Sequence, residues 1–548
     1  MSKTYSPLAN SLPRVSAPNR QSARPGLAAL VAAVLAACTG GPEEGDLGYV
    51  SGFFGGVVAD EPRAALVGRD VLSAGGSAAD AAVAIYFTMA VTYPGAASLG
   101  GGGVCLVHDP VAKRTEALEF FASRPARVTP GAERPTAVPG NVRGMFALHA
   151  RYGLRDWGAL LRPAERLARQ GNAVSRAFAT ELRPAARGLF TDAAARDLFA
   201  QADGSPVVEG QLVRQVELAA VLTVLRSQGP GAFYGGSLGR GLVEAVAAAG
   251  GTLSLEDLRA YKPRYVAPIR VGFGSQTLVF TPAAGGGVAA QLWAILNQDG
   301  RYDRAPAEEA PHLFAEAAHR VFADRGRWMD EAGASLIGGE ALVAEERLAG
   351  LMRGYDPRRH VAASDPAPRA SQGGAAGLVV ADRFGQVVAC NVTLNYPFGT
   401  GRIAPGAGIL LAAAPGIGGR GATDLGAMLM INENNDLVYY GAVASGGSAA
   451  PTAQVRVALE TLGAGAGLSA ALASPRLHHG GEPDILWHET TLEEAQRVAL
   501  VARGHVLQPA DRLGRVVAFH CPGGLPRDRL CEFAADPRGF GLAISAED

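Results

Sequence analysis

Residues 371–400 contain three serine and threonine hydroxyls, a side-chain type that can act as a nucleophile: Ser371, Thr393 and Thr400. A hydroxyl attacks a carbonyl carbon effectively only when a neighbouring base activates it. Thr393 and Thr400 lie in strand-like and glycine-rich surroundings, where threonine is common because of its β-propensity alone. Their positions therefore favour an ordinary structural role over a nucleophilic one.

Histidines that could bind a metal occur near the C-terminus. His478 and His479 are adjacent, and His488 follows in the same region. The cysteines and histidines show no spacing typical of a zinc site. We therefore expect these histidines to be structural, and we expect neither a metal nor a cofactor.

A longer pattern surrounds the threonines. Residues 373–382 read Gly-Gly-Ala-Ala-Gly-Leu-Val-Val-Ala-Asp, a second apolar stretch covers 386–395, and Phe-Gly-Thr-Gly follows at 398–401. This run resembles the core of the γ-glutamyltransferase (glutathione hydrolase) family. The matching segment of that family opens on a threonine nucleophile, in a Thr-Thr-His-x-Ser-Val-Val-Asp pattern. Counting back without gaps from Asp382 places Ala375 at the position of that threonine.

The resemblance implies a fold and a mechanism. These enzymes are N-terminal nucleophile hydrolases, in which the precursor cuts itself before the threonine and the freed α-amine then serves as the base. Ala375 has no hydroxyl, so we expect neither self-cleavage nor γ-glutamyl transfer, and one uncut chain. Ser371 would substitute only through a shift of register that breaks the Val-Val-x-Asp match.

Four further positions match the family. Thr393 corresponds to a threonine that supports the nucleophile, and Asn395 to an asparagine that contacts the glutamyl group. Gly446 and Gly447 correspond to the pair whose backbone amides form the oxyanion hole, where glycine lets the backbone approach closely. Inherited strand and turn geometry explains all four, and in the absence of a nucleophile we favour that explanation.

Other positions depart from the family pattern. Ala376 and Gly377 replace the neighbouring Thr-His, and Phe121 falls where the family has an arginine that pairs with the substrate carboxylate. Arg124 is a nearby replacement for that arginine, although its default role is a surface charge. The run at 412–415, Ala-Ala-Ala-Pro, replaces the Asn-Asn region that holds the substrate amine, and Asp424 lies near the position of the family's serine pair.

Composition indicates a globular protein with a large core. The chain has 548 residues, of which 48% are hydrophobic and 18% charged, and 72 are glycine. The formal net charge of −1 gives no electrostatic reason to expect nucleic-acid binding.

The N-terminus has the pattern of an export signal. A basic region precedes the short apolar run 26–35, which is too short to span a bilayer and ends in Leu-Ala-Ala before Cys38. This favours a bacterial lipoprotein signal at 1–37, with Cys38 lipidated, over a plain secretory signal in which Cys38 is incidental. Residues 38–48 then form a tether, and no later stretch resembles a transmembrane helix.

The other cysteines fit an exported protein. Cys521 and Cys531 bracket a short Pro/Gly-rich segment and are a possible disulfide pair in an oxidising compartment. Cys105 and Cys390 lie in apolar, strand-like runs, and we expect them to be buried free thiols.

The resemblance implies an α+β fold with four αββα layers, in which two mainly antiparallel sheets stack between helices. Residues 49–374 resemble the large subunit of the family and 375–548 the small subunit, as one intertwined domain. Local patterns predict helices at 65–73, 81–91 (capped by Ser77 or Asp80), 141–152 and 160–170. They also predict a hairpin at 429–440 that turns at Asn434-Asn435.

Three functions remain open. The first is a lipid-anchored, non-catalytic family member on the periplasmic or extracytoplasmic side of the cell envelope, with a small amino acid or peptide as ligand. The second is an active γ-glutamyl hydrolase, transferase or related amidase that uses a different nucleophile. The third is an enzyme that acts through oriented water in the inherited cleft.

Overall fold

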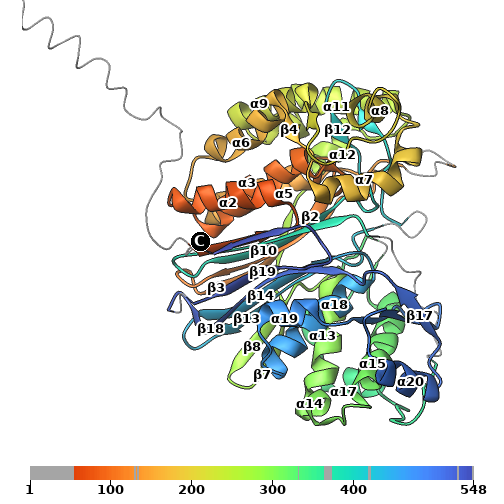
Figure 1. The fold of residues 1–548 in the computed structure, drawn as a ribbon. Helices are drawn as coiled ribbons and strands as arrows, with labels where there is room; N and C mark the ends of the chain where they lie inside the picture. The colour runs from red at the N-terminus through yellow and green to blue at the C-terminus, as the bar shows by residue number, and fades with distance from the viewer. Residues whose placement is uncertain are drawn as a thin grey trace, which may run out of the picture. The chain divides into compact units, whose positions relative to one another are not determined.

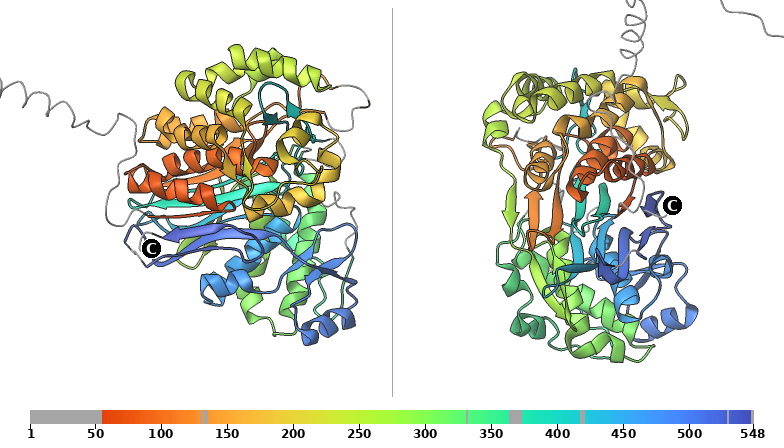
Figure 2. Two further views of the ribbon diagram at one scale, coloured as in Figure 1. Left: turned by 45° about the horizontal axis from the view of Figure 1, so that its top comes forward. Right: turned by 90° about the vertical axis from the view of Figure 1, so that its left-hand side faces the viewer.

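Two antiparallel sheets stack face to face between two layers of helices, as Figure 1 shows, and Figure 2 gives the same layers from two other directions. The computed structural model describes residues 55–128, 131, 135–330, 332–362, 373–416, 421–527 and 530–545. Within this part of the chain, the predicted αββα architecture is confirmed.

The first sheet has seven strands in the order β20-β1-β9-β10-β2-β3-β6. Its strands are β20 (Leu542–Ser545), β1 (Gly55–Ala59), β9 (Ala375–Asp382), β10 (Val387–Thr393), β2 (Gly102–Asp109), β3 (Arg114–Phe120) and β6 (Arg264–Val266). Strands β9 and β10, from the C-terminal part of the chain, therefore lie between strands from the N-terminal part.

The second sheet has six strands in the order β19-β18-β14-β13-β8-β7. They are β19 (Glu532–Ala535), β18 (Arg515–Leu525), β14 (Leu437–Ser445), β13 (Ala427–Asn432), β8 (Gln276–Phe280) and β7 (Ile269–Phe273). The predicted hairpin is β13–β14. A smaller sheet joins β15 (Leu477–His479), β16 (Leu486–Glu489) and β17 (Leu507–Ala510), and two short pairs join β4 (Asn172–Ala173) with β5 (Leu212–Val213) and β11 (Ile403–Ala404) with β12 (Ile409–Leu410).

Apolar side chains fill the space between the two large sheets. Val58, Leu106 and Val379 from the first sheet pack with Val443 and Phe519 from the second, and all five are buried. Every residue of β9 and β10 is buried, because the second sheet covers one face and helices cover the other. This explains why these strands lack the alternation of polar and apolar residues that a half-exposed strand shows.

Helices from residues 62–260 cover the outer face of the first sheet (Figure 1). They are α2 (Pro62–Ser73), α3 (Ala78–Thr92), α4 (Pro94–Ala97), α5 (Asn141–Tyr152), α6 (Trp157–Gln170), α7 (Arg176–Leu189), α8 (Ala193–Phe199), α9 (Val216–Gln228), α10 (Gly231–Tyr234), α11 (Ser237–Ala248) and α12 (Leu255–Ala260). Ser77 begins α3 with a capping box, in which its side chain accepts from the Asp80 N–H while the Asp80 carboxylate accepts from the Ser77 N–H. Of the two predicted caps, Ser77 is therefore the one at the N-cap position.

The remaining helices cover the second sheet and the small sheet beside it (Figure 1). They are α13 (Ala284–Asn297), α14 (Arg301–Arg304), α15 (Ala310–Asp324), α16 (Gly339–Leu342), α17 (Glu345–Leu351), α18 (Ala449–Ala458), α19 (Leu468–Ala473) and α20 (Glu494–Ala502). No helix in the described part of the chain is both long enough and apolar enough to cross a membrane.

The prediction of free thiols at Cys105 and Cys390 is wrong. The two residues form a disulfide, because β2 and β10 are antiparallel neighbours and their register places Cys105 directly opposite Cys390, with 4.0 Å between the Cα atoms. Burial was predicted correctly, but the pairing of two distant strands is not visible in either local pattern. Cys521 and Cys531 are also disulfide-bonded. Cys38, the predicted signal and the predicted tether lie outside the described residues.

Candidate functional site

A small open pocket with a cavity volume of about 20 Å³ lies where β9 begins. Its wall combines the start of β9 and the ends of β10 and β14 with the segment before β13. The lining residues are Gly373, Gly374, Ala375, Thr393, Asn395, Tyr396, Gly421, Ala422, Asp424, Leu425, Ala444, Ser445, Gly446, Gly447 and Ala450. Five predicted site positions therefore meet here: Ala375, Thr393, Asn395, Gly446 and Gly447.

Ala375 and Thr393 are directly opposite each other in the β9–β10 pair. The Thr393 hydroxyl donates to the Gly374 carbonyl oxygen at 2.8 Å and accepts from the Asn395 N–H at 3.0 Å. The Asn395 side-chain amide donates to the Ala413 carbonyl oxygen at 2.9 Å. These two polar side chains therefore hold the backbone around Ala375.

Gly446 and Gly447 adopt positive φ angles of 117° and 72° at the turn between β14 and α18, which favours glycine. The segment that leads into β9 passes directly beside them, since a Cβ atom added to Gly373 would lie 3.1 Å from the Gly446 carbonyl carbon. Gly374 is equally restricted, with a φ of 137° and a close approach to Pro397. The chain before Ala375 thus occupies the space next to the glycine pair.

Apolar side chains surround the Ala375 methyl group. Ala375 belongs to a cluster with Phe121 and Leu425 that is completed by Val104, Ala283, Ala284 and Ala422. Phe121 is only 9% exposed. The position at which the resemblance places a carboxylate-binding arginine is therefore part of a hydrophobic contact. Arg124 is exposed and does not line the pocket.

One acidic side chain of the pocket is paired with a buried cation. Asp424 lines the pocket, and its Oδ1 atom accepts from Arg325 Nη1 at 2.8 Å, with both side chains at most 7% exposed. No local sequence pattern singles out Arg325 as the partner of Asp424, because the two residues are 99 positions apart in the chain. Because this arginine already compensates the carboxylate, Asp424 is a weaker site for a substrate amine than an unpaired acid would be.

A second polar network lies behind β9. The Arg515 guanidinium donates to the Ala375 carbonyl oxygen at 3.3 Å and to Glu181 at 2.9 Å. Asp60 accepts from the Gly377 N–H and from the Ser445 hydroxyl, each at 2.9 Å. Burial raises the pKa of the Asp60 carboxyl, and the nearby Arg515 charge offsets part of that rise.

Ser445 is the pocket hydroxyl that sequence reasoning overlooked. It ends β14, lines the pocket and immediately precedes Gly446, while its Oγ donates to the buried Asp60 carboxylate. The signal was its place beside the glycine pair. Thr400 does not line the pocket, and Ser371 lies outside the described residues.

Two of the three histidines singled out in the sequence are held by ordinary hydrogen bonds. His478 contacts the hydroxyls of Ser448 and Thr452 at 3.2 and 3.0 Å, and His488 Nδ1 lies 2.9 Å from the Glu489 carbonyl oxygen. The third, His479, donates from Nε2 to the Asp484 carboxylate at 3.0 Å.

The sequence model of a protein family described as Gamma-glutamyltranspeptidase matches residues 64–414 and 420–546. The chain belongs to this family. The match covers both large sheets and most of their helices, and it includes the start of β9, where the pocket lies.

Known members and relatives span nearly the whole chain. The glutathione hydrolase proenzyme of Escherichia coli (strain K12) is 27% identical over 84% of this chain and 87% of its own length. Human glutathione hydrolase 7 is 30% identical over 84% of this chain and 75% of its own length. The acylase ACY 1 proenzyme of Pseudomonas sp. (strain SE83) is 29% identical over 90% of this chain and 94% of its own length. The crystal structure of cephalosporin acylase from Bacillus halodurans has the same fold, with a TM-score of 0.78 at 23% identity over 92% and 98% of the two chains.

Proposed function

We propose that this chain is a γ-glutamyltranspeptidase-family protein that neither hydrolyses glutathione nor transfers γ-glutamyl groups, and that it acts by binding a small amino acid or peptide. The observation that carries the proposal is the Ala375 methyl group at the first position of β9, at the wall of the pocket. A methyl group has no lone pair with which to attack a carbonyl. It also cannot support the cleavage that would release an N-terminal nucleophile.

The surroundings of Ala375 support this proposal. A zwitterionic glutamyl head needs a cation for its carboxylate and an anion for its amine, each desolvated and paired. Phe121, at the position where the resemblance places the cation, belongs to the same buried apolar cluster as Ala375, and the Asp424 carboxylate is already paired with Arg325. The loss of both partners together with the nucleophile argues against a slow version of the family reaction.

A denaturing gel and an activity assay of the purified protein test the proposal. We expect a single uncut chain and no release of the anilide from a chromogenic γ-glutamyl anilide or of glutamate from glutathione. Two fragments that meet at Ala375, together with glutathione hydrolysis, would overturn it. Ligand binding is tested separately by the shift in melting temperature with free amino acids, glutathione and other short peptides.

We also propose that the protein is exported and anchored to the bacterial cell envelope through a lipid on Cys38, as the N-terminal pattern suggests. In cells that express the full chain, we expect wild type in the membrane fraction and Cys38→Ala in the soluble periplasmic or secreted fraction. Equal membrane association of the two would contradict lipid anchoring at this residue.

A second candidate function rests on Ser445. Its hydroxyl lies in the pocket wall and is hydrogen-bonded to a buried carboxylate, which is the arrangement of a nucleophile beside a base. In that case the protein is an amidase for a substrate without a glutamyl head. A panel of aliphatic and aromatic amides distinguishes the two, because turnover that is lost in Ser445→Ala supports the amidase and no turnover in either protein supports the binding protein.

A further inference from the structure

A group of titratable side chains gathers on the helical layer of the second sheet, away from the pocket. Three of its members, His312, Glu316 and His319, belong to α15, and Arg325, the partner of Asp424, follows the other end of this helix. At 1.5 Å per residue, His312 lies about 20 Å along the axis from Arg325. We call this group the histidine cluster; it consists of His312, Glu316, His319, His360, His479, Asp484 and His505.

Most of the cluster is shielded from water. His312, Glu316, His319, His479 and His505 are at most 4% exposed. Five imidazoles this close together cannot all be protonated, because each positive charge disfavours the next. Some of the rings are therefore neutral, and each neutral ring carries one nitrogen lone pair that can bind a metal.

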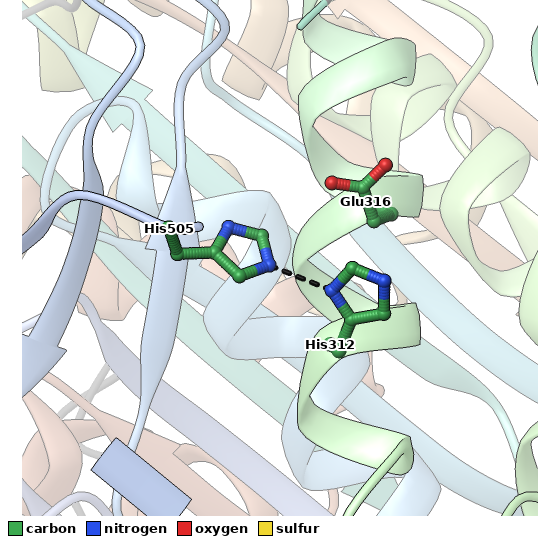
Figure 3. A group of neighbouring side chains, drawn as sticks. All are labelled: His312, Glu316 and His505. Carbon is green, nitrogen blue, oxygen red and sulfur yellow. Dashed lines mark hydrogen bonds between the residues drawn. The ribbon is translucent and has the colours of Figure 1, made fainter. Parts of the chain in front are cut away.

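One end of the cluster brings two ring nitrogens face to face (Figure 3). His312 and Glu316 are four residues apart on α15 and therefore share one face of the helix. His505 enters from the segment between α20 and β17, and its Nε2 lies 2.7 Å from His312 Nδ1. One ligand atom from each of the three residues lies within 4.8 Å of the others.

The hydrogen bond behind His312 decides which of its nitrogens is free to bind. Its Nε2 lies 2.9 Å from the backbone carbonyl oxygen of Asp356, which can only accept, so Nε2 carries the proton. Nδ1 therefore presents its lone pair toward His505. A backbone carbonyl behind a histidine is the arrangement that orients ligands in metal sites.

The other end of the cluster has protons where a metal would need lone pairs. His479 Nδ1 accepts from the Gly481 N–H at 3.2 Å, so its Nε2 carries the proton and donates to Asp484 at 3.0 Å. His360 faces carboxylates with both nitrogens, Glu316 at 2.5 Å and Asp484 at 3.1 Å, and donates to both. This end is thus a closed hydrogen-bonded network.

We propose that His312 Nδ1, His505 Nε2 and the Glu316 carboxylate bind one divalent cation of the zinc type, with a fourth position left for water. Two imidazoles and a carboxylate are a donor set that Zn²⁺ accepts, and three protein ligands with one open position are a known arrangement for it. Tetrahedral ligands at zinc distances are about 3.3 Å apart, so the ion requires the two rings to open by about 0.6 Å from their present contact. Arg320 and His360, which contact Glu316, remain as its outer hydrogen-bond partners.

The test uses the untagged full-length protein, stripped with a chelator and titrated with Zn²⁺. We expect one zinc per chain by elemental analysis, and a Co²⁺-substituted protein with the visible absorption of a four-coordinate site without thiolate ligands. In His312→Gln and His505→Gln we expect the affinity for Zn²⁺ to fall at least about 10-fold. His108→Gln is the matched control, because His108 is equally buried but bonds to Thr115 and to the Asp436 carbonyl oxygen in another part of the protein.

The alternative is a direct hydrogen bond from His505 to His312 with no metal. Failure of the wild-type protein to bind zinc more tightly than micromolar would support that alternative and overturn the site. Stoichiometric binding that both glutamine variants retain would overturn this choice of ligands. If either variant fails to fold, the Co²⁺ spectrum of the wild-type protein decides, since an octahedral, water-like spectrum contradicts the proposed donors. None of these outcomes depends on whether Ala375 abolishes catalysis.

Discussion

The Thr393 hydroxyl donates a 2.8 Å hydrogen bond to the carbonyl oxygen of Gly374, the residue that immediately precedes Ala375. This bond ties the end of β10 to the peptide that active relatives would have to cut, according to the family resemblance. With an alanine at the next position, we expect the bond to hold an intact backbone in place rather than to orient a reactive group, and we therefore expect a structural role for Thr393.

Replacing Ala375 with threonine tests whether the missing hydroxyl is the whole defect. We expect Ala375→Thr to remain without detectable glutathione hydrolysis, because the family resemblance places the buried Phe121 at the position of the cation that should pair with the substrate carboxylate. The added atoms should also cost about 1–3 kcal/mol of unfolding free energy in this packed cluster. Glutamate release and urea unfolding measure the two effects, and Ala375→Val controls for packing. Hydrolysis restored by the single change would contradict this account of the pocket.

The Arg325–Asp424 pair should be sensitive to the loss of one partner. Arg325→Met leaves a buried carboxylate without its cation, and we expect the unfolding free energy to fall by about 3–5 kcal/mol. The double variant Arg325→Met/Asp424→Leu removes both charges and should recover most of that loss. Urea unfolding of wild type, both single variants and the double variant gives the coupling directly. If the losses of unfolding free energy in the two single variants add up in the double variant, the two side chains do not interact.

Asp382 should make stability depend on pH. Burial raises the pKa of its carboxyl from 3.8 to about 6, although it accepts hydrogen bonds from the Ala78, Phe384 and Gln386 N–H groups. Between these two pH values the folded state binds the proton more tightly than the unfolded state. The contribution of Asp382 to the free energy of unfolding is therefore fully present below pH 3.8. It is lost as pH rises through 6, by about 3 kcal/mol in total.

The measurement for Asp382 is a difference between two proteins. The unfolding free energy of wild type minus that of Asp382→Asn should fall as pH rises from 4 to 7, because other titrating groups cancel in the subtraction. A difference that stays constant over this range would show that Asp382 has an ordinary pKa in the folded state.

We expect the two disulfides to contribute unequally to the free energy of unfolding. Cys105–Cys390 closes a loop with a sequence separation of 285, whereas Cys521–Cys531 closes one of 10. The chain-entropy relation gives about 6 kcal/mol for the first and about 3 kcal/mol for the second. Serine replacement of each pair, followed by denaturant unfolding under non-reducing conditions, measures both. A larger loss for the short loop would contradict the entropic ordering.

Local patterns were sufficient for many elements. The helix at 141–152 begins and ends where its apolar spacing predicts, and Ser77 caps α3 as its residue type suggests. Helix α2 begins at Pro62, earlier than the predicted Ala65, because Glu61 caps it and proline fits the first turn. Such features depend on a few neighbouring residues, so the sequence determines them directly.

The sequence by itself also determined the central chemical fact, since the side chain of an alanine at position 375 has no oxygen, whatever surrounds it. Only the tertiary structure decided which distant residues meet: Cys105 with Cys390, Arg325 with Asp424, Ser445 with Asp60, and His312 with His505. Each of these pairs joins two segments whose local sequence patterns are compatible with many tertiary arrangements. Their contacts arise from the register of the strands and the packing of the layers, which are fixed by the burial of the whole core rather than by any local stretch.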